Sequence, residues 1–283
     1  VPMPSTSGYS SRFENVGSMI NRGVDLTLNV DIVQTKDWHV GFNATFSYNK
    51  SKITKLFNGY TEYAMPNYLL CYAIGHDAGE FYMQKFHGVN PENGNPQWEV
   101  VDPETGAISL TENFNNATMQ LLGKSRYAPY YGGFGVDASW KGISVAANFT
   151  WNYGKYTVNN MLLFLESPGN AASFNSGKHL LNMWRKPGDI TNVPKWGTNP
   201  QFDSHMLEDA SFLRLKNLTV AYDFPKSLIR KSGFIEGLRI YFIGRNLLTA
   251  TGYSGYDPEM DTNLSLGNYP NSREFVGGIQ LTV

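Results

Sequence analysis

The chain has 283 residues, a net charge of −1 and 17% charged residues, so its composition gives no support to a general polyanion-binding role. Aromatic residues make up 14% of the chain and glycines number 28, a mixture that favours strands and tight turns over helices. The single cysteine, Cys71, excludes an internal disulfide and a cysteine-based zinc cluster. No run of about 18 apolar residues occurs, so we predict no transmembrane helix.

The N-terminal stretch, VPMPSTSGYSSRFENVG, opens in a loop-like run of Pro, Ser and Gly residues. It lacks the basic region followed by an apolar region that marks a signal peptide. We therefore expect the chain to be a fragment of a longer protein.

The first predicted elements form a hairpin of two unusually long strands. In GVDLTLNVDIV, residues 23–33, apolar and polar residues alternate strictly, which indicates a strand with one apolar face. The apolar row consists of Val24, Leu26, Leu28, Val30 and Ile32. A short polar link at 34–37 leads to WHVGFNATFSYNK, residues 38–50, which alternates in the same way.

The later predicted strands follow the same pattern with varying regularity. Two less regular strands, at 79–89 and 96–101, flank the turn NPENGN and add a second hairpin. Further strands are expected at 133–140, 143–153, 211–225, 238–249 and 274–283, for about nine in all. The only plausible helix lies around KHLLNMWRKPGD, residues 178–189, where Pro187 and Gly188 would end it.

The strand SFLRLKNLTVAYDFP, residues 211–225, changes phase part of the way along. Leu213 and Leu215 point to one side, and Arg214 and Lys216 point to the other. Beyond Asn217 the apolar row shifts by one residue, and it then consists of Leu218, Val220, Tyr222 and Phe224. We predict a β-bulge near Asn217. If the strand belongs to a barrel, the two cations would lie near its outer rim or point into its lumen.

The links between the predicted strands alternate in length. The short ones lie at 34–37, 89–95, 141–142 and 225–237, and the long ones at 51–78, 102–130, 158–205 and 250–272. Strands of 10 to 13 residues, one apolar face, short turns at one end and long loops at the other are typical of an outer-membrane β-barrel. The apolar row would face lipid and the polar row a wet lumen. The alternative is a soluble β-sandwich, which explains neither the strand length nor the one-sided loops.

Four stretches resemble the SusC/RagA family of TonB-dependent outer-membrane transporters. They are NVGSMINRGVDLTL (15–28), GKSRYAPYYGGFGVDASWKGISV (123–145), SFLRLKNLTVAYDFP (211–225) and RIYFIGRNLLTATGYSGYDPEM (239–260). The terminal strand is also similar, and the resemblance covers most of residues 9–165 and 205–283. Residues 166–204 match nothing in the family, as expected for a variable outer loop. The chain ends in Val283, whereas family members often end in an aromatic residue.

The resemblance implies an all-β fold, in which residues 1–283 form the C-terminal part of an antiparallel transmembrane barrel of about 22 strands. The plug, the segment that contacts TonB and the earlier strands would then lie outside this chain. The N-terminal loop would be extracellular and the C-terminus periplasmic. The implied function is import of oligosaccharides or peptides through the outer membrane of a Gram-negative, Bacteroidetes-like bacterium, with a SusD-like lipoprotein as lid.

No catalytic, metal or cofactor site is predicted, because the five histidines are scattered and no nucleophile or phosphate-binding motif occurs. Aromatic side chains in or beside the long links suit sugars or peptides, but they could equally form the interfacial girdle of a barrel. The carboxylates of GYDPEM could bind a cation or sugar hydroxyls, or could bond to backbone amides. The candidate contact residues are Trp98, Tyr130, Trp184, Trp196, Tyr253, Tyr256, Asp257 and Glu259.

Two other functions remain open from the sequence. One is a passive or structural outer-membrane barrel, and the other is a soluble carbohydrate-binding sandwich. A plug domain and a TonB-contacting motif upstream would favour active import, whereas extraction without detergent would favour the sandwich.

Overall fold

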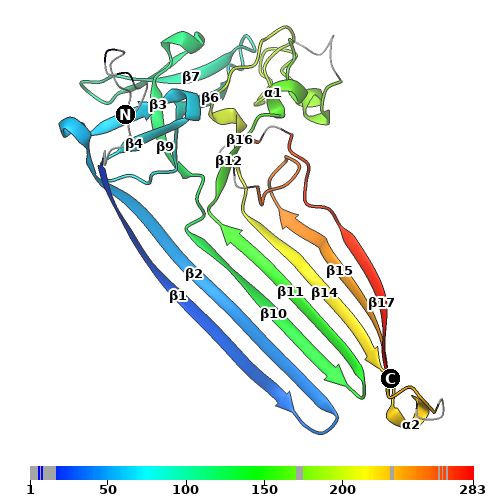
Figure 1. Ribbon diagram of the computed structural model, residues 1–283. Coiled ribbons are helices and arrows are strands. Elements are labelled where there is room, and N and C mark those ends of the chain that lie inside the picture. The colour runs from blue at the N-terminus through cyan, green and yellow to red at the C-terminus, as the bar shows by residue number, and fades with distance from the viewer. Residues whose placement is uncertain are drawn as a thin grey trace.

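The computed structural model describes residues 6, 8, 17–169, 175–229, 233–260, 262, 264–265 and 267–283. Its largest element is a seven-stranded antiparallel sheet with the order β1-β2-β10-β11-β14-β15-β17, hereafter the wall (Figure 1). The wall strands are β1 (Gly17–Gln34), β2 (Trp38–Leu56), β10 (Tyr130–Trp140), β11 (Ile143–Tyr153), β14 (Phe212–Asp223), β15 (Gly237–Thr251) and β17 (Glu274–Thr282). Strands that follow one another within the wall are also neighbours in space, as in a meander.

The strand register places the apolar residues of successive strands on one face of the wall. Leu28 lies opposite Ala44, Ala44 opposite Phe134, and the row continues through Phe149 to Leu215. The next row along the strands runs through Asn29, Asn43, Gly135, Asn148 and Asn217 on the other face. Val24, Leu26 and Leu28 are each more than half exposed although they are apolar, so the described part of the chain leaves this stretch of the face uncovered. A face of this kind is what the barrel interpretation assigns to lipid.

Aromatic residues border the apolar face at both ends. Trp38 stacks on Trp140 at one end, with ring centroids 5.4 Å apart, and Tyr48 packs against Tyr130 at the other, at 5.0 Å. The two borders are ten residues apart on each strand. Ten residues extend about 33 Å, or about 25 Å along the membrane normal at a tilt of about 40°, which matches the apolar band of outer-membrane barrels.

The predicted bulge in the strand at 211–225 is confirmed. The register of β14 shifts between Leu215 and Asn217 on the side of β15, and β11 shows the corresponding shift between Asn148 and Phe149. At this point β14 has one residue more than β11, namely Lys216. The apolar residues therefore change from odd to even sequence positions but stay on the same face of the wall along the whole strand. Arg214 and Lys216 consequently lie on the polar face near the outer end of β14.

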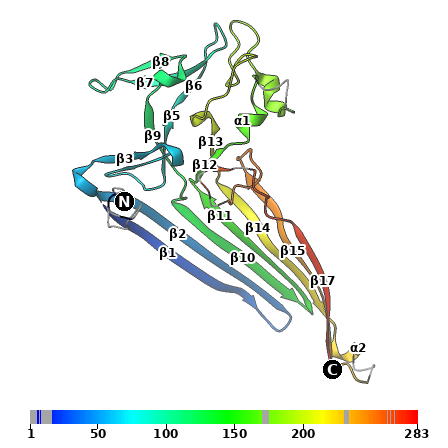
Figure 2. The same ribbon diagram turned by 45° about the horizontal axis from the view of Figure 1, so that its top comes forward.

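The links of the wall differ in length between its two ends. The described residues of the segments 35–37, 141–142 and 224–236 close one end, where β17 also finishes (Figure 1). The described residues of the segments 57–129, 154–211 and 252–273 lie at the other end, where β1 begins (Figure 2). This agrees with the predicted alternation, except that the link at 89–95 belongs to the end with the long links.

The long links are folded into an outer module, defined as the described residues of 57–129, 154–211 and 252–273. It contains β3 (Glu62–Met65), β4 (Leu70–Ala73), β5 (Glu80–Gln84) and β9 (Met119–Ser125) in one sheet. A second sheet contains β6 (Phe86–Val89), β7 (Pro96–Val101) and β8 (Ile108–Thr111). A third contains β13 (Leu207–Asp209), β12 (Tyr156–Asn159) and β16 (Leu264–Ser265).

The prediction that about nine strands share one barrel sheet is therefore wrong for two of them. The strand at 79–89 is split into β5 and β6, and the strand at 96–101 is β7; all three belong to the outer module. The hairpin around NPENGN does form, between β6 and β7. These strands have four to six residues, too few to span a bilayer, which needs about 9–11.

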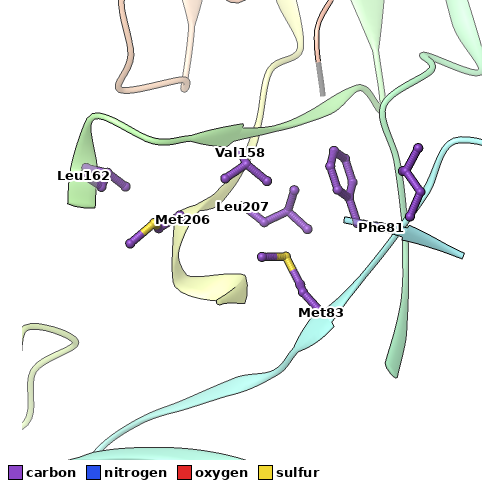
Figure 3. Packing of buried hydrophobic residues seen from close by; sticks show 7 residues of the cluster. Phe81, Met83, Val158, Leu162, Met206 and Leu207 are labelled. Atoms are coloured by element: carbon purple, nitrogen blue, oxygen red, sulfur yellow. The ribbon is translucent and has the colours of Figure 1, made fainter. Parts of the chain in front are cut away.

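The outer module has its own hydrophobic core, so its links are not simple loops. Phe81 and Met83 come from the first long link, and Val158, Leu162 and Leu207 come from the second (Figure 3). Phe81, Met83 and Val158 are fully buried. Packing of side chains from two separate links holds these links together.

Helices are few and short in the residues that the structure describes. The α-helices are α1 (Leu162–Leu165) and α2 (Lys226–Ile229), and the 3₁₀-helices are η2 (Phe57–Gly59), η3 (Pro66–Tyr68), η4 (Phe114–Asn116), η5 (Lys178–Asn182) and η6 (Ser204–Met206). The helix predicted over 178–189 is wrong beyond Asn182, because one turn without a buried apolar face is not stable as an α-helix. Among the described residues, no helix combines the length and apolar character needed to cross a membrane.

The first prediction tests which face of the wall contacts lipid. Leu28→Arg places a charge on the apolar face near its middle, and it should cost about 2–4 kcal/mol of folding free energy in the full-length protein. Asn29→Arg, one residue away on the polar face, should cost much less. Unfolding in a bilayer or detergent measures both, and equal costs would contradict the assignment of the faces.

The second prediction concerns the open edges of the wall. Within the described chain β1 pairs only with β2, and β17 only with β15, so each leaves one row of backbone groups unpaired. Unpaired backbone groups are not tolerated in lipid. Residues 1–283 expressed alone should therefore aggregate or remain unfolded, as size-exclusion chromatography would show. A monodisperse, heat-stable and water-soluble product would contradict this account.

Candidate functional site

The outer ends of β14 and β15 carry a cluster of charged residues that we call the rim latch. It joins Arg214 and Lys216 of β14 to Asp257 and Glu259 of the link 252–273. Arg214 Nη2 donates to Asp257 Oδ1 at 2.6 Å, and Arg214 Nη1 donates to Glu259 Oε2 at 2.5 Å. Lys216 Nζ lies 2.6 Å from Glu259 Oε1. Asp257 and Arg214 are almost fully buried, so the ion pair between them is shielded from water.

Backbone groups supply further hydrogen bonds to the rim latch. The amides of Glu259 and Asn271 donate to Asp257 at 2.9 Å each. Burial alone would raise the pKa of Asp257, but the hydrogen bonds from Arg214 and the two amides outweigh it and lower the pKa. Lys155 adds a third cation, whose Nζ donates to the carbonyl oxygens of Pro258 and Met260. Arg214, Lys216 and Lys155 thus all bind the segment 257–260.

This geometry bears on the two interpretations of GYDPEM. The carboxylates of Asp257 and Glu259 are engaged by cations and backbone amides of the protein itself, as expected of a structural loop. In the part of the chain that the structure describes, no group of three His, Cys, Asp or Glu side chains is arranged to hold a metal ion. The latch fixes the link 252–273 across the outer end of the wall.

Two of the other predicted contact residues are buried in the outer module. Trp98 is 3% exposed, and its Nε1 donates to Asp203 Oδ2 at 2.6 Å. Burial raises the pKa of Asp203, against the lowering effect of the hydrogen bonds from Trp98 and the His205 amide. Tyr253 is 6% exposed and its ring covers Gly255 so closely that a Cβ there would lie 2.4 Å from it. Both rings pack the module from within.

Two further candidates are engaged by other parts of the protein. Tyr130 lies on the apolar face of the wall beside Tyr48 and Tyr153, where it belongs to the aromatic border. Trp184 donates from Nε1 to the carbonyl oxygen of Pro91 at 3.0 Å, and its ring lies against Gly94. Trp184 therefore attaches the segment after η5 to the β6–β7 turn.

The two remaining candidates project into solvent. Trp196 and Tyr256 are each 59% exposed. Exposed aromatic rings at the membrane-distal end of the wall are suited to contact a ligand or another protein.

The structure also assembles a cluster that the sequence did not reveal. Glu166 accepts a hydrogen bond from His205 Nε2 at 2.9 Å, and His179 Nδ1 lies 3.6 Å from the other oxygen of the same carboxylate. Burial lowers the pKa of His205, but the hydrogen bond and charge of Glu166, together with Asp203 and Glu208, raise it overall. Glu166, His179, His205 and Glu208 line a cavity of about 450 Å³ between the links 154–211 and 252–273. Their sequence spacing matches no motif, so only the folded module brings them together.

The third prediction tests the rim latch. Arg214→Ala leaves Asp257 buried with no cation, and the loss of one partner from a buried ion pair typically costs about 3–5 kcal/mol. Arg239→Ala is a matched control, because Arg239 and Asp223 form an exposed pair at 3.5 Å whose value is about 0–1 kcal/mol. Urea unfolding of the full-length protein measures both variants.

The latch also predicts a dependence on pH. Because the folded state lowers the pKa of Asp257, its contribution is complete above the unfolded pKa of about 3.9 and disappears as pH falls through the folded pKa. The stability difference between wild type and Arg214→Ala should therefore shrink below about pH 4. A difference that stays constant at acid pH would contradict the charge interaction.

Comparison with known proteins finds TonB-dependent receptors among sequence relatives and the RagAB peptide transporter among solved structures. No model of a protein family matches the chain. TonB-dependent receptor P3 of Formosa agariphila is 29% identical over 99% of the chain and 30% of its own length. TonB-dependent receptor SusC of Bacteroides thetaiotaomicron is 25% identical over 99% of the chain and 28% of its own length.

Among solved structures, the RagAB peptide transporter is 45% identical with a TM-score of 0.88, over 99% of the chain and 31% of the solved chain. The open-open state of the RagAB peptide importer is 44% identical with a TM-score of 0.89. The chain thus spans about three tenths of the length of the proteins it matches. Over nearly its whole length it is similar to one part of TonB-dependent receptors such as SusC and of the RagAB peptide transporter.

Proposed function

We propose that the chain forms part of a TonB-dependent outer-membrane transporter that imports peptides. The observation that carries this proposal is the 45% identity to the RagAB peptide transporter over 99% of the chain, at a TM-score of 0.88. The identity to SusC is lower, at 25%. We therefore favour peptides over the oligosaccharides that the sequence had left open.

In this proposal the wall crosses the outer membrane of a Gram-negative, Bacteroidetes-like bacterium. Its one-sided apolar face, bordered by Trp38 with Trp140 at one end and Tyr48 with Tyr130 at the other, supports that position. The remaining strands, the plug and the segment that contacts TonB would belong to the part of the protein outside this chain. The protein would transport its substrate and catalyse no reaction.

The outer module would meet the substrate and a SusD-like surface lipoprotein acting as lid. It lies at the end of the wall opposite the short turns, where the rim latch attaches it to β14 and a core shared by two of its links holds them together. A rigid module suits a surface that must bind a partner repeatedly, because little conformational freedom is lost on binding. The exposed rings of Trp196 and Tyr256 are the candidates for these contacts.

The soluble sandwich and the passive barrel, the two alternative functions, differ from this proposal in what they require. A soluble sandwich requires a second sheet packed on the apolar face, and the described residues place none there. A passive or structural barrel shares the wall with a transporter, and it differs in requiring no energy input.

The fourth prediction separates active import from passive diffusion. Cells that express the full-length protein should accumulate labelled peptides, and deletion of TonB should abolish the accumulation while the protein stays in the outer membrane. Membrane abundance, measured by immunoblot, is the control. Accumulation that persists without TonB would favour the passive barrel and contradict the proposal.

A variant pair tests the role of the outer module. Tyr256→Ala removes an exposed ring, so it should weaken peptide uptake or lid association without changing membrane abundance. Trp98→Ala removes a buried ring that Asp203 holds, so it should lower abundance itself. Point changes are cleaner than deleting 166–204, because that deletion would also remove Asp203. Unchanged uptake and lid association in Tyr256→Ala would exclude this ring as a contact.

A further inference from the structure

A cleft of about 590 Å³ opens on the outer module between the second small sheet and the segment 195–201. One side is formed by β7 and the residues around η4, and the other by Lys195, Trp196 and the residues that follow. The volume lies within the usual range of about 300–1,000 Å³ for small-ligand sites. The cleft shares no lining residue with the cavity at His179 and His205.

The cleft is held in shape by contacts behind its walls. On one side Glu112 accepts hydrogen bonds from the side-chain amides of Asn90, Asn93 and Asn95, at 2.7–2.9 Å. These bonds lower the pKa of Glu112 and keep it ionised. On the other side the Lys195 amide donates to the Gly94 carbonyl oxygen at 3.0 Å. The two walls are therefore joined at the β6–β7 turn.

Several groups in the cleft are free to bind a ligand. The side-chain amides of Asn115, Asn199 and Gln201 line it, and none has a hydrogen-bond partner in the part of the chain that the structure describes. Trp196 adds an indole ring that is 59% exposed. Each amide carries both a donor and an acceptor, and the ring adds an apolar surface.

The charge of the cleft narrows the class of ligand. Lys195 and Glu112 contribute one positive and one negative charge, and the remaining polar groups are neutral. A neutral site with paired donors and acceptors matches the backbone of an extended peptide, whose N–H and C=O groups a primary amide can bind together. The indole ring would cover a side chain of the peptide.

We propose that this cleft binds peptides through their backbone, with Asn115, Asn199 and Gln201 as hydrogen-bonding groups and Trp196 as the apolar platform. Recognition of this kind is independent of peptide sequence. The inference rests on the proposed function and adds a specific site and mode of binding to it.

The test uses the full-length protein in detergent and two probes. The first is a short uncharged peptide of Gly, Ala and Ser with blocked ends, and the second is the same peptide N-methylated at alternate backbone nitrogens. Isothermal titration calorimetry should show that N-methylation weakens binding to wild type by about tenfold, because it removes backbone donors. In a variant with Asn115, Asn199 and Gln201 all changed to Ala, binding of the first peptide should fall at least tenfold, and N-methylation should have little further effect.

Two more variants make the result specific. Trp196→Ala should weaken binding at least about tenfold, whereas Trp196→Phe, which keeps an aromatic face, should retain most of it. Asn67→Ala is the matched control, because Asn67 is an exposed amide in η3 outside this cleft, and it should bind like wild type. Equal thermal unfolding of all variants shows that the module is intact.

The outcomes separate this inference from the proposed function. If wild type imports peptides but the cleft variants bind the unmodified probe as wild type does, the cleft is not the site and the import function stands. If wild type neither binds nor imports peptides, both fail. If a linear glucose oligosaccharide binds in a manner that depends on Trp196 and the peptide does not bind, the cleft is a glycan site and the proposal is overturned.

Discussion

Lipid offers no hydrogen-bond partners to a polypeptide backbone, and the structure of the wall depends on that constraint. An antiparallel ladder satisfies the backbone within the membrane, and it requires strands long enough to cross the bilayer without interruption. The alternation of side chains then follows from the pleat, with Leu28 and its row on the lipid side and Asn29 and its row on the other. The bulge at Lys216 follows the same constraint. The apolar residues of β14 change from odd to even positions there, yet they all remain on the lipid side.

Outside the membrane, water can bind the backbone, and the links need other interactions to hold a fixed structure. Burial of apolar side chains and ion pairs supply these interactions. The links form a module with a core of its own, in which Phe81 and Val158 are completely buried. The rim latch joins this module to the wall through Arg214 and Asp257, which are nearly inaccessible to water. A buried ion pair with satisfied hydrogen bonds adds little net stability, but it holds the two segments that it joins in a defined arrangement. The wall can therefore carry a surface of defined geometry at its outer end.

The sequence predicted the wall well because its signal is local. Period-two alternation in Val24 to Ile32 and the phase slip near Asn217 are visible within a few residues, and both are found in the structure. The strands at 79–89 and 96–101 were assigned to the wrong sheet, because short-range alternation does not distinguish a membrane strand from a strand in a small outer sheet. The helix expected after residue 178 has only one 3₁₀ turn, since no partner surface buries an apolar side of it.

The candidate site was less predictable because it depends on contacts between distant residues. Arg214 and Asp257 are 43 residues apart, and Trp98 and Asp203 are 105 apart. No local pattern shows that Trp98 is buried while Trp196, in a similar polar context, is exposed. The same holds for Glu166 and His205, which the module brings to 2.9 Å from positions 39 residues apart.

The most direct test of the account is a scan of spin labels along β14 in the full-length protein, reconstituted in a bilayer. Accessibility to oxygen, which partitions into lipid, is measured at each position and compared with accessibility to a water-soluble nickel reagent. The account predicts oxygen maxima at Leu213 and Leu215, then at Leu218, Val220 and Tyr222, with the phase reversed across Lys216 and Asn217. An unbroken alternation through Lys216, or equal exposure to the nickel reagent on both faces, would contradict it.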